Sequence, residues 1–169
     1  NVWEKWTTSN PPTKREKAAS IVYNNYLWIY GGKDNVETFD EVYKLHLSNK
    51  AWTKVSTTGN TPTARSGHTA NRYKNKMLVF GGLLNDGDVH ALNLDSNSWE
   101  IITTTGTKPS ARRDHDAVVW KDSLILFGGE DTGSNNVGLS DTYTLDLTSN
   151  VWSKITATGS PPSARKKHK

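Results

Sequence analysis

The sequence contains no cysteine among its 169 residues. It therefore offers no disulfide, no thiolate metal ligand and no cysteine nucleophile. No apolar run approaches the roughly 18 residues that a membrane-spanning helix requires, and the N-terminus lacks the basic and then apolar segments of a signal peptide. We therefore expect no contact with a membrane, and we place the protein in the cytoplasm or the nucleus.

An excess of one charge sign is confined to the last few residues. The formal net charge is +4, from 21 Lys and Arg against 17 Asp and Glu. Four of the basic residues, Arg165, Lys166, Lys167 and Lys169, stand at the C-terminal end, where no acidic residue occurs. Without them the two signs are equal in number, so we interpret this tail as a chain end and expect no nucleic-acid partner.

A repeat of about 50 residues is the strongest feature of the sequence. Each copy has an apolar segment that ends in a Gly-Gly pair, then a tryptophan, then an arginine and a histidine. Thirty residues separate Trp52 from Gly82, and thirty separate Trp99 from Gly129. The repeat residues to which we assign structural roles are Gly31, Gly32, Trp52, Arg65, His68, Gly81, Gly82, Trp99, Arg112, His115, Gly128, Gly129, Trp152 and Arg165.

The composition of each copy predicts four short β-strands. In the third copy these are expected at 116–120, 124–127, 142–147 and 152–155, because β-branched and aromatic residues alternate there with turn-forming pairs. No segment shows a sustained helical period. A sheet of four strands cannot bury its own face, whereas radial stacking of several sheets can. The sequence thus predicts an all-β protein of stacked four-stranded antiparallel sheets.

These motifs resemble the kelch-repeat family of β-propellers, in the version found in host-cell-factor, cell-end-marker and Rab-effector kelch proteins. The resemblance implies a partial propeller, with an outer strand at 3–8 within a link at 1–14, blades at 15–64, 65–111 and 112–164, and the start of a truncated blade at 165–169. Ala18 departs from the pattern by replacing the first histidine. The resemblance also implies a ring of more than three blades, so we expect further blades or self-association to cover the exposed sheet faces.

Each element that recurs in the three copies of the repeat has a structural interpretation and a functional one. The tryptophans are expected to pack between blades, although stacked bases could use the same surface. The histidines are expected to be structural rather than a metal site. The arginines are expected to bond acids just before each third strand, namely Glu41, Asp88 and Asp141; the alternative is a ring of arginines that binds an acidic ligand. Galactose oxidase shares the kelch fold, but its copper site needs a cysteine, so we predict neither catalysis nor a cofactor nor a metal.

One end of the sheets is expected to recognise a partner. All length variation falls in the loops between second and third strands, at 33–40, 83–87 and 130–140, and the position two after each arginine changes chemistry between copies. A fixed frame with variable tips suits recognition. We therefore expect substitutions at these tips to leave stability nearly unchanged, above all in the longest loop. The candidate partner-binding residues are Lys17, Lys33, Asp34, Asn35, Gly67, Leu83, Leu84, Asn85, Asp114, Glu130, Asp131, Asn135, Asn136 and Lys167.

The function expected from this arrangement is that of a non-catalytic scaffold or adaptor that binds a protein partner. One alternative is a targeting or regulatory module of a larger enzyme, such as a phosphatase. Another is a propeller that binds a small molecule or a metal. The residues alone leave these alternatives open.

Overall fold

The computed structural model describes residues 2–83, 87–133 and 137–168. Within these residues the chain forms 15 β-strands and no helix, which confirms the all-β prediction. No helix that could span a membrane is found in this part of the chain.

Three antiparallel sheets, each with four strands joined in chain order, make up the frame. The first contains β1 (Ala19–Tyr23), β2 (Tyr26–Tyr30), β3 (Val42–His46) and β4 (Trp52–Val55). The second contains β6 (His68–Tyr73), β7 (Lys76–Gly81), β8 (Val89–Asn93) and β9 (Ser98–Ile102). The third contains β12 (Asp116–Trp120), β13 (Ser123–Asp131), β14 (Gly138–Asp146) and β15 (Val151–Ile155).

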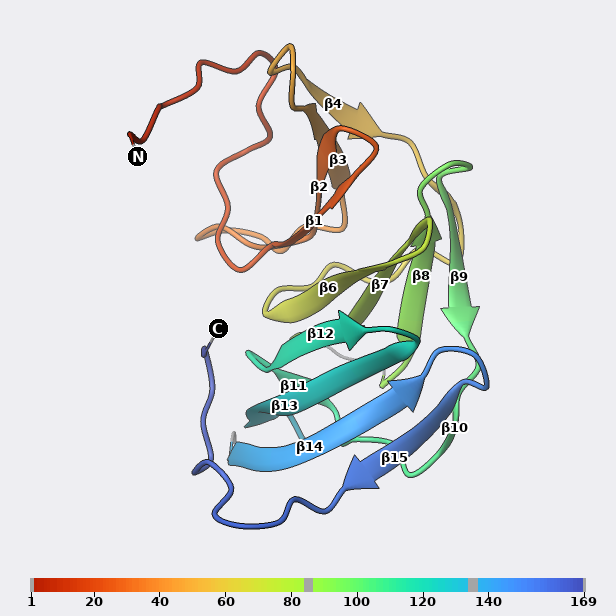
Figure 1. The fold of residues 1–169 in the computed structure, drawn as a ribbon. Coiled ribbons are helices and arrows are strands. Elements are labelled where there is room, and N and C mark those ends of the chain that lie inside the picture. The colour runs from red at the N-terminus through yellow and green to blue at the C-terminus, as the bar shows by residue number, and fades with distance from the viewer. Residues whose placement is uncertain (1, 84–86, 134–136, 169) are drawn as a thin grey trace.

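The sheets follow one another along a curve, as in part of a propeller (Figure 1). Their first strands, β1, β6 and β12, lie on the inner side, where β6 contacts both of the others. Their last strands, β4, β9 and β15, lie on the outer side (Figure 1). This arrangement agrees with the predicted partial kelch propeller.

Short parallel strands in the links tie each outer strand to the segment before it. β5 (Thr58–Gly59) pairs with β9, and β10 (Thr105–Gly106) pairs with β15. Each link thus leaves one sheet and runs along the outer edge of the next. Sequence reasoning missed these strands, because two residues are too few to show an alternating pattern.

Residues 3–8, which were predicted to form an outer strand, are not paired as a strand within the described residues. Residues 2–8 belong to no strand, and the first backbone pairing with the sheet is a parallel bridge between Ser9 and Ala51. Because the bridge is parallel and Ala51 immediately precedes β4, the residues before Ser9 run past the beginning of β4. They therefore have no strand edge of that sheet beside them.

The hairpin of the third sheet is longer than predicted. β13 continues to Asp131 and β14 begins at Gly138, with Glu130 paired to Gly138 and a register shift between Phe127 and Gly129. A further strand, β11 (Arg112–Arg113), pairs with the end of β13. Five of the eleven positions expected in the loop at 130–140, namely 130, 131 and 138–140, are therefore part of the sheet, because the link at 112–113 supplies a partner for the extended strand.

Two apolar clusters lie between neighbouring sheets, and a repeat tryptophan belongs to each. The Trp99 ring lies 5.1 Å from the Tyr30 ring of the first sheet, and the Trp152 ring lies 5.4 Å from the Phe80 ring of the second. Both tryptophans are buried. Trp52 is only half-buried, since among the described residues no sheet precedes the first one. The core is thus built by packing blade on blade.

Candidate functional site on the loop face

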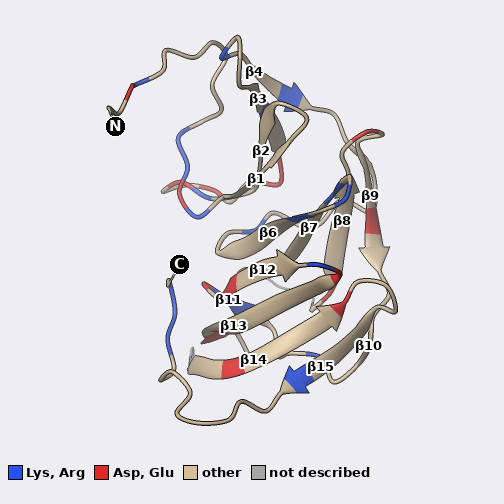
Figure 2. Ribbon diagram, viewed as in Figure 1, with Lys and Arg blue, Asp and Glu red and all other residues tan. Residues whose placement is uncertain are grey.

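The links that enter β1, β6 and β12 lie at the same end of the sheets as the loops β2–β3, β7–β8 and β13–β14, because antiparallel strands alternate in direction. We call this end the loop face. Both charge signs occur along it and elsewhere on the three sheets, and the C-terminal tail is basic (Figure 2). The loop face therefore has mixed charge rather than a surface of one sign.

The Gly-Gly pairs hold each sheet against the link that follows it. The second glycine of every pair donates its N–H to the carbonyl of the next repeat arginine at 2.9 Å, in the bonds Gly32–Arg65, Gly82–Arg112 and Gly129–Arg165. A side chain on the first glycine would obstruct this approach, since a Cβ at Gly31 would lie 2.6 Å from the Arg65 carbonyl oxygen. The pair therefore serves the backbone.

The repeat arginines lie beneath the links and bond to their own sheets. Arg112 Nη1 donates to the Gly128 carbonyl at 2.9 Å and to Asp141 Oδ1 at 2.7 Å. Arg15 forms the equivalent bonds to Gly31, at 3.0 Å, and Glu41, at 2.9 Å. Because Arg65 and Arg112 are fully buried, the structure places them in the frame rather than where an acidic ligand could reach.

The repeat histidines pack edge-on against aromatic rings of the preceding sheet. The ring centroids of His68 and Tyr30 are 5.3 Å apart, those of His115 and Phe80 5.6 Å, and those of His168 and Phe127 5.4 Å. No group of three or more metal-ligating side chains occurs in the described part of the chain. The equal geometry in three copies favours a packing role for these histidines.

The four positions that follow each arginine by two form an inner belt, which consists of Lys17, Gly67, Asp114 and Lys167. Each belt residue after Lys17 donates its N–H to the carbonyl of the previous one, at 3.1 Å, 2.7 Å and 2.8 Å in chain order. All four have a positive φ between 53° and 72°. One backbone geometry therefore presents a different side chain at each step around the axis, beside an opening of about 360 Å³.

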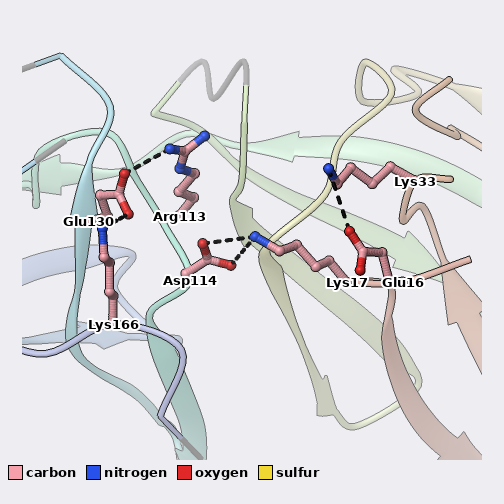
Figure 3. Close-up of polar contacts among 7 residues, drawn as sticks. All are labelled: Glu16, Lys17, Lys33, Arg113, Asp114, Glu130 and Lys166. Carbon is pink, nitrogen blue, oxygen red and sulfur yellow. Dashed lines mark hydrogen bonds and ion pairs between the residues drawn. The ribbon is translucent and has the colours of Figure 1, made fainter. Parts of the chain in front are cut away.

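An ion pair joins the first and third links across the second. Lys17 Nζ lies 3.1 Å from both carboxylate oxygens of Asp114 (Figure 3). The Asp114 side chain is only 7% exposed. A Cβ at Gly67 would lie 2.9 Å from Asp114 Oδ1, so the glycine leaves room for the carboxylate. Asp114 was expected as an exposed tip, and the curvature of the stack places it in an internal contact instead.

A second cluster lies around Glu130, directly after the third Gly-Gly pair. Its carboxylate accepts from Lys166 at 2.6 Å and from Arg113 at 2.7 Å (Figure 3). Lys166 first and Arg113 second lower the pKa of Glu130 to about 2. The side chain is 4% exposed. Glu130 was predicted to lie in a variable loop, but the structure places it in β13, where it joins the third sheet to the link that follows it.

The other candidate residues remain closer to the solvent. Lys33 Nζ lies 3.5 Å from Glu16 (Figure 3). Asp34 accepts from the N–H groups of Val36 and Glu37, and chiefly the Glu37 bond lowers its pKa. Asn35 is exposed.

In the other two loops, Leu83 is 37% exposed. Asp131 accepts from the Gly133 N–H at 2.7 Å. Four candidates lie outside the described residues, namely Leu84, Asn85, Asn135 and Asn136.

Sequence reasoning missed the partners of the buried carboxylates. Lys17 and Asp114 occupy the same repeat position with opposite charge, which was a usable signal. Glu16 and Arg113 likewise follow the repeat arginine, while Lys33 and Glu130 follow the Gly-Gly pair. Opposite charges at equivalent positions of different copies could therefore have indicated the Lys17–Asp114 and Arg113–Glu130 contacts.

Comparison with known proteins agrees with this geometry. A family model described as the KLHDC2/KLHL20/DRC7 Kelch-repeats domain matches residues 1–169. The chain belongs to the kelch-repeat family. Domains of this family are in general protein-interaction modules.

Three curated relatives are much longer than the matched segment. Putative protein tag-53 of Caenorhabditis elegans is 33% identical over 86 residues, which are 49% of this chain and 6% of that protein. Host cell factor 2 of Homo sapiens is 32% identical over 77 residues, 42% of this chain and 10% of that protein. Tip elongation aberrant protein 1 of Schizosaccharomyces pombe is 34% identical over 79 residues, 44% of this chain and 7% of that protein.

Proposed function

We propose that this chain is a non-catalytic protein-binding module and that its loop face holds a segment of a protein partner. The inner belt is the observation that carries this proposal. Its four residues share one backbone conformation and one hydrogen-bond pattern, yet they present two lysines, a glycine and an aspartate. A constant backbone with varied side chains is suited to recognition of an irregular surface.

The contacts described above separate two groups among the loop-face residues. Asp114 and Glu130 are nearly buried and bonded within the chain, so we assign them to holding the links in place. Lys167 and Asn35 are exposed, and Lys33 and Leu83 are partly exposed. These four residues are the ones that we expect to contact the partner directly.

Binding should be tested by retention of proteins on the immobilised full-length protein, with each retained species quantified by mass spectrometry. Lys167→Glu and Asn35→Lys should each reduce retention of the specific partner by about fivefold, as for an interface residue worth about 1 kcal/mol. Lys121→Glu is a matched control, because Lys121 has a φ of 54°, close to the 58° of Lys167, but lies at the opposite end of the sheets.

Both loop-face variants should melt within a few degrees of the unmodified protein. The contrary result is that both loop-face variants retain the partner as well as the unmodified protein does, while Lys121→Glu retains less of it. That result would place the partner elsewhere. In that case the loop face would not be the recognition surface.

A further inference from the structure

The two interfaces between neighbouring sheets use equivalent strand positions but are filled by side chains of different size. Trp28 in β2 and Leu78 in β7 each lie three residues before a Gly-Gly pair, and Tyr26 and Lys76 each lie five residues before it. The first interface thus receives an indole and a phenol at positions where the second receives a leucine and a lysine. Less aromatic volume enters the space between the second and third sheets.

A groove of about 500 Å³ occupies this space, at the end of the sheets opposite the loop face. We call it the turn-face groove. It is bordered by the β6–β7 turn and by Leu78, Glu100 and Ile102 of the second sheet, and by Leu147 and Asn150 of the third. Its volume falls in the range of about 300–1,000 Å³ that is typical of ligand sites.

A pair of equivalent leucines shows independently that an apolar cover is missing from the groove. Leu94 and Leu147 each lie five residues before the repeat tryptophan, and each donates its N–H to a turn carbonyl, at 2.9 Å and 2.8 Å. Leu94 is 5% exposed and belongs to the same core cluster as Trp28. Leu147 is only half-buried. The backbone is the same in both places, so the difference comes from the side chains that cover it.

The lining of the groove is mixed, with polar side chains around it and with Ile101, Ile102 and Leu147 as its accessible apolar groups. Lys76 and Glu100 form an ion pair at 2.5 Å, with their side chains 37% and 53% exposed. Lys74 Nζ lies 4.7 Å from the ring centroid of Tyr73. A mixed lining of apolar side chains and charged groups suits a ring that has an apolar body and a polar N–H group.

We propose that the turn-face groove binds a large aromatic side chain, with tryptophan the best fit, from a partner polypeptide. The identity of the occupant follows from the first interface, where the chain's own Trp28 occupies the equivalent position and is 2% exposed. There the indole ring belongs to the same apolar cluster as Leu94. In the groove, where Leu78 is only 2% exposed, an incoming indole packs mainly on Leu147 and Ile102. This site is separate from the loop face and does not depend on the function proposed for it.

The probe for this site is N-acetyl-tryptophanamide, with N-acetyl-alaninamide as the negative probe, observed by saturation-transfer NMR on the full-length protein. Saturable transfer is expected for the tryptophan derivative alone. Leu78→Trp places an indole in the groove and should weaken binding at least about tenfold, a loss of about 1.4 kcal/mol. Lys76→Tyr introduces the residue that the first interface has at the equivalent position, Tyr26, and should also weaken binding because its ring enters the groove.

Val22→Trp is the matched control, because it adds an indole at a position that is 54% exposed and lies on β1, away from the groove. It should leave binding unchanged. If Leu78→Trp does not fold, as shown by its melting curve, Lys76→Tyr decides the question. Equal transfer to both probes, or unchanged binding in a folded groove variant, would overturn the proposal whatever the loop-face experiment shows.

Discussion

Replacement of Arg112 by alanine should destabilise the third sheet more than any exposed substitution on the loop face. The Arg112 side chain is fully buried. Its guanidinium donates to the Gly128 carbonyl at 2.9 Å and to the two oxygens of Asp141 at 2.7 Å and 3.2 Å, and its Nε donates to the Ser110 carbonyl at 3.1 Å. Alanine would leave the carboxylate and both carbonyls without these donors.

The size of the effect follows from the burial of the pair. Removal of one partner from a buried ion pair costs about 3–5 kcal/mol. The Asp141 side chain is 20% exposed, so water can solvate it in part, and we expect a loss of about 2–3 kcal/mol. For a chain of this size, each kcal/mol lowers the melting temperature by about 2–4 °C, so the expected decrease is about 4–12 °C.

Arg165 provides a matched control in the same repeat position. It is exposed and, among the described residues, donates its side-chain N–H groups only to Ser163. Arg165→Ala in the 169-residue chain should therefore change stability by less than about 0.5 kcal/mol. Thermal melting and urea unfolding measure both variants. Equal losses for Arg112→Ala and Arg165→Ala, or no loss for Arg112→Ala, would refute the reasoning from burial.

Three further predictions follow from other contacts. The pKa of Glu130 is about 2 in the folded state and 4.5 ordinarily, so the stability that its carboxylate contributes is present above pH 4.5 and is lost as the pH falls toward 2. After screening by solvent, Glu130→Gln should remove about 1–2 kcal/mol of this stability. Urea unfolding over a series of pH values measures the loss. Gly67→Ala should lower the free energy of unfolding by about 1–2 kcal/mol, because the added Cβ displaces the Asp114 carboxylate. In urea unfolding, the same substitution should lower it by less when Asp114 is already alanine. Val118 and Trp120 are 58% and 60% exposed on the uncovered face of β12, so the chain should self-associate in sedimentation velocity, and Trp120→Glu should reduce this; a monomer at all concentrations would contradict it.

The repeat register made the frame predictable from the sequence. An aromatic residue or histidine lies nine residues before each repeat tryptophan, at Tyr43, His90 and Tyr143. This constant spacing allowed the positions of the third and fourth strands to be predicted. The 5.1 Å contact between Trp99 and Tyr30 shows the packing between blades that such a spacing favours. Features that recur in every copy were therefore accessible to sequence reasoning.

Features that depend on how the copies are arranged in space were not predictable in the same way. Lys17 and Asp114 are 97 residues apart and meet because the stack curves around the second link. Residues 3–8 were expected to form a strand from the resemblance to the kelch repeat, but a strand also needs a neighbouring edge. The length of β13 likewise depends on its pairing with β11, which a loop rich in Gly, Ser and Asn does not reveal.

The internal ion pairs change what a partner can meet on the loop face. Asp114 and Glu130 carry negative charge, but their carboxylates are 7% and 4% exposed and each lies against at least one cation of the chain. Lys167 instead shares its backbone conformation with Asp114 and remains exposed. Because a charge contributes to specificity mainly when the partner can desolvate and pair it, the count of charged residues overstates the acidity available to a partner. Recognition on this face should depend on the exposed belt and loop residues, while the buried carboxylates keep the links at the spacing that presents them.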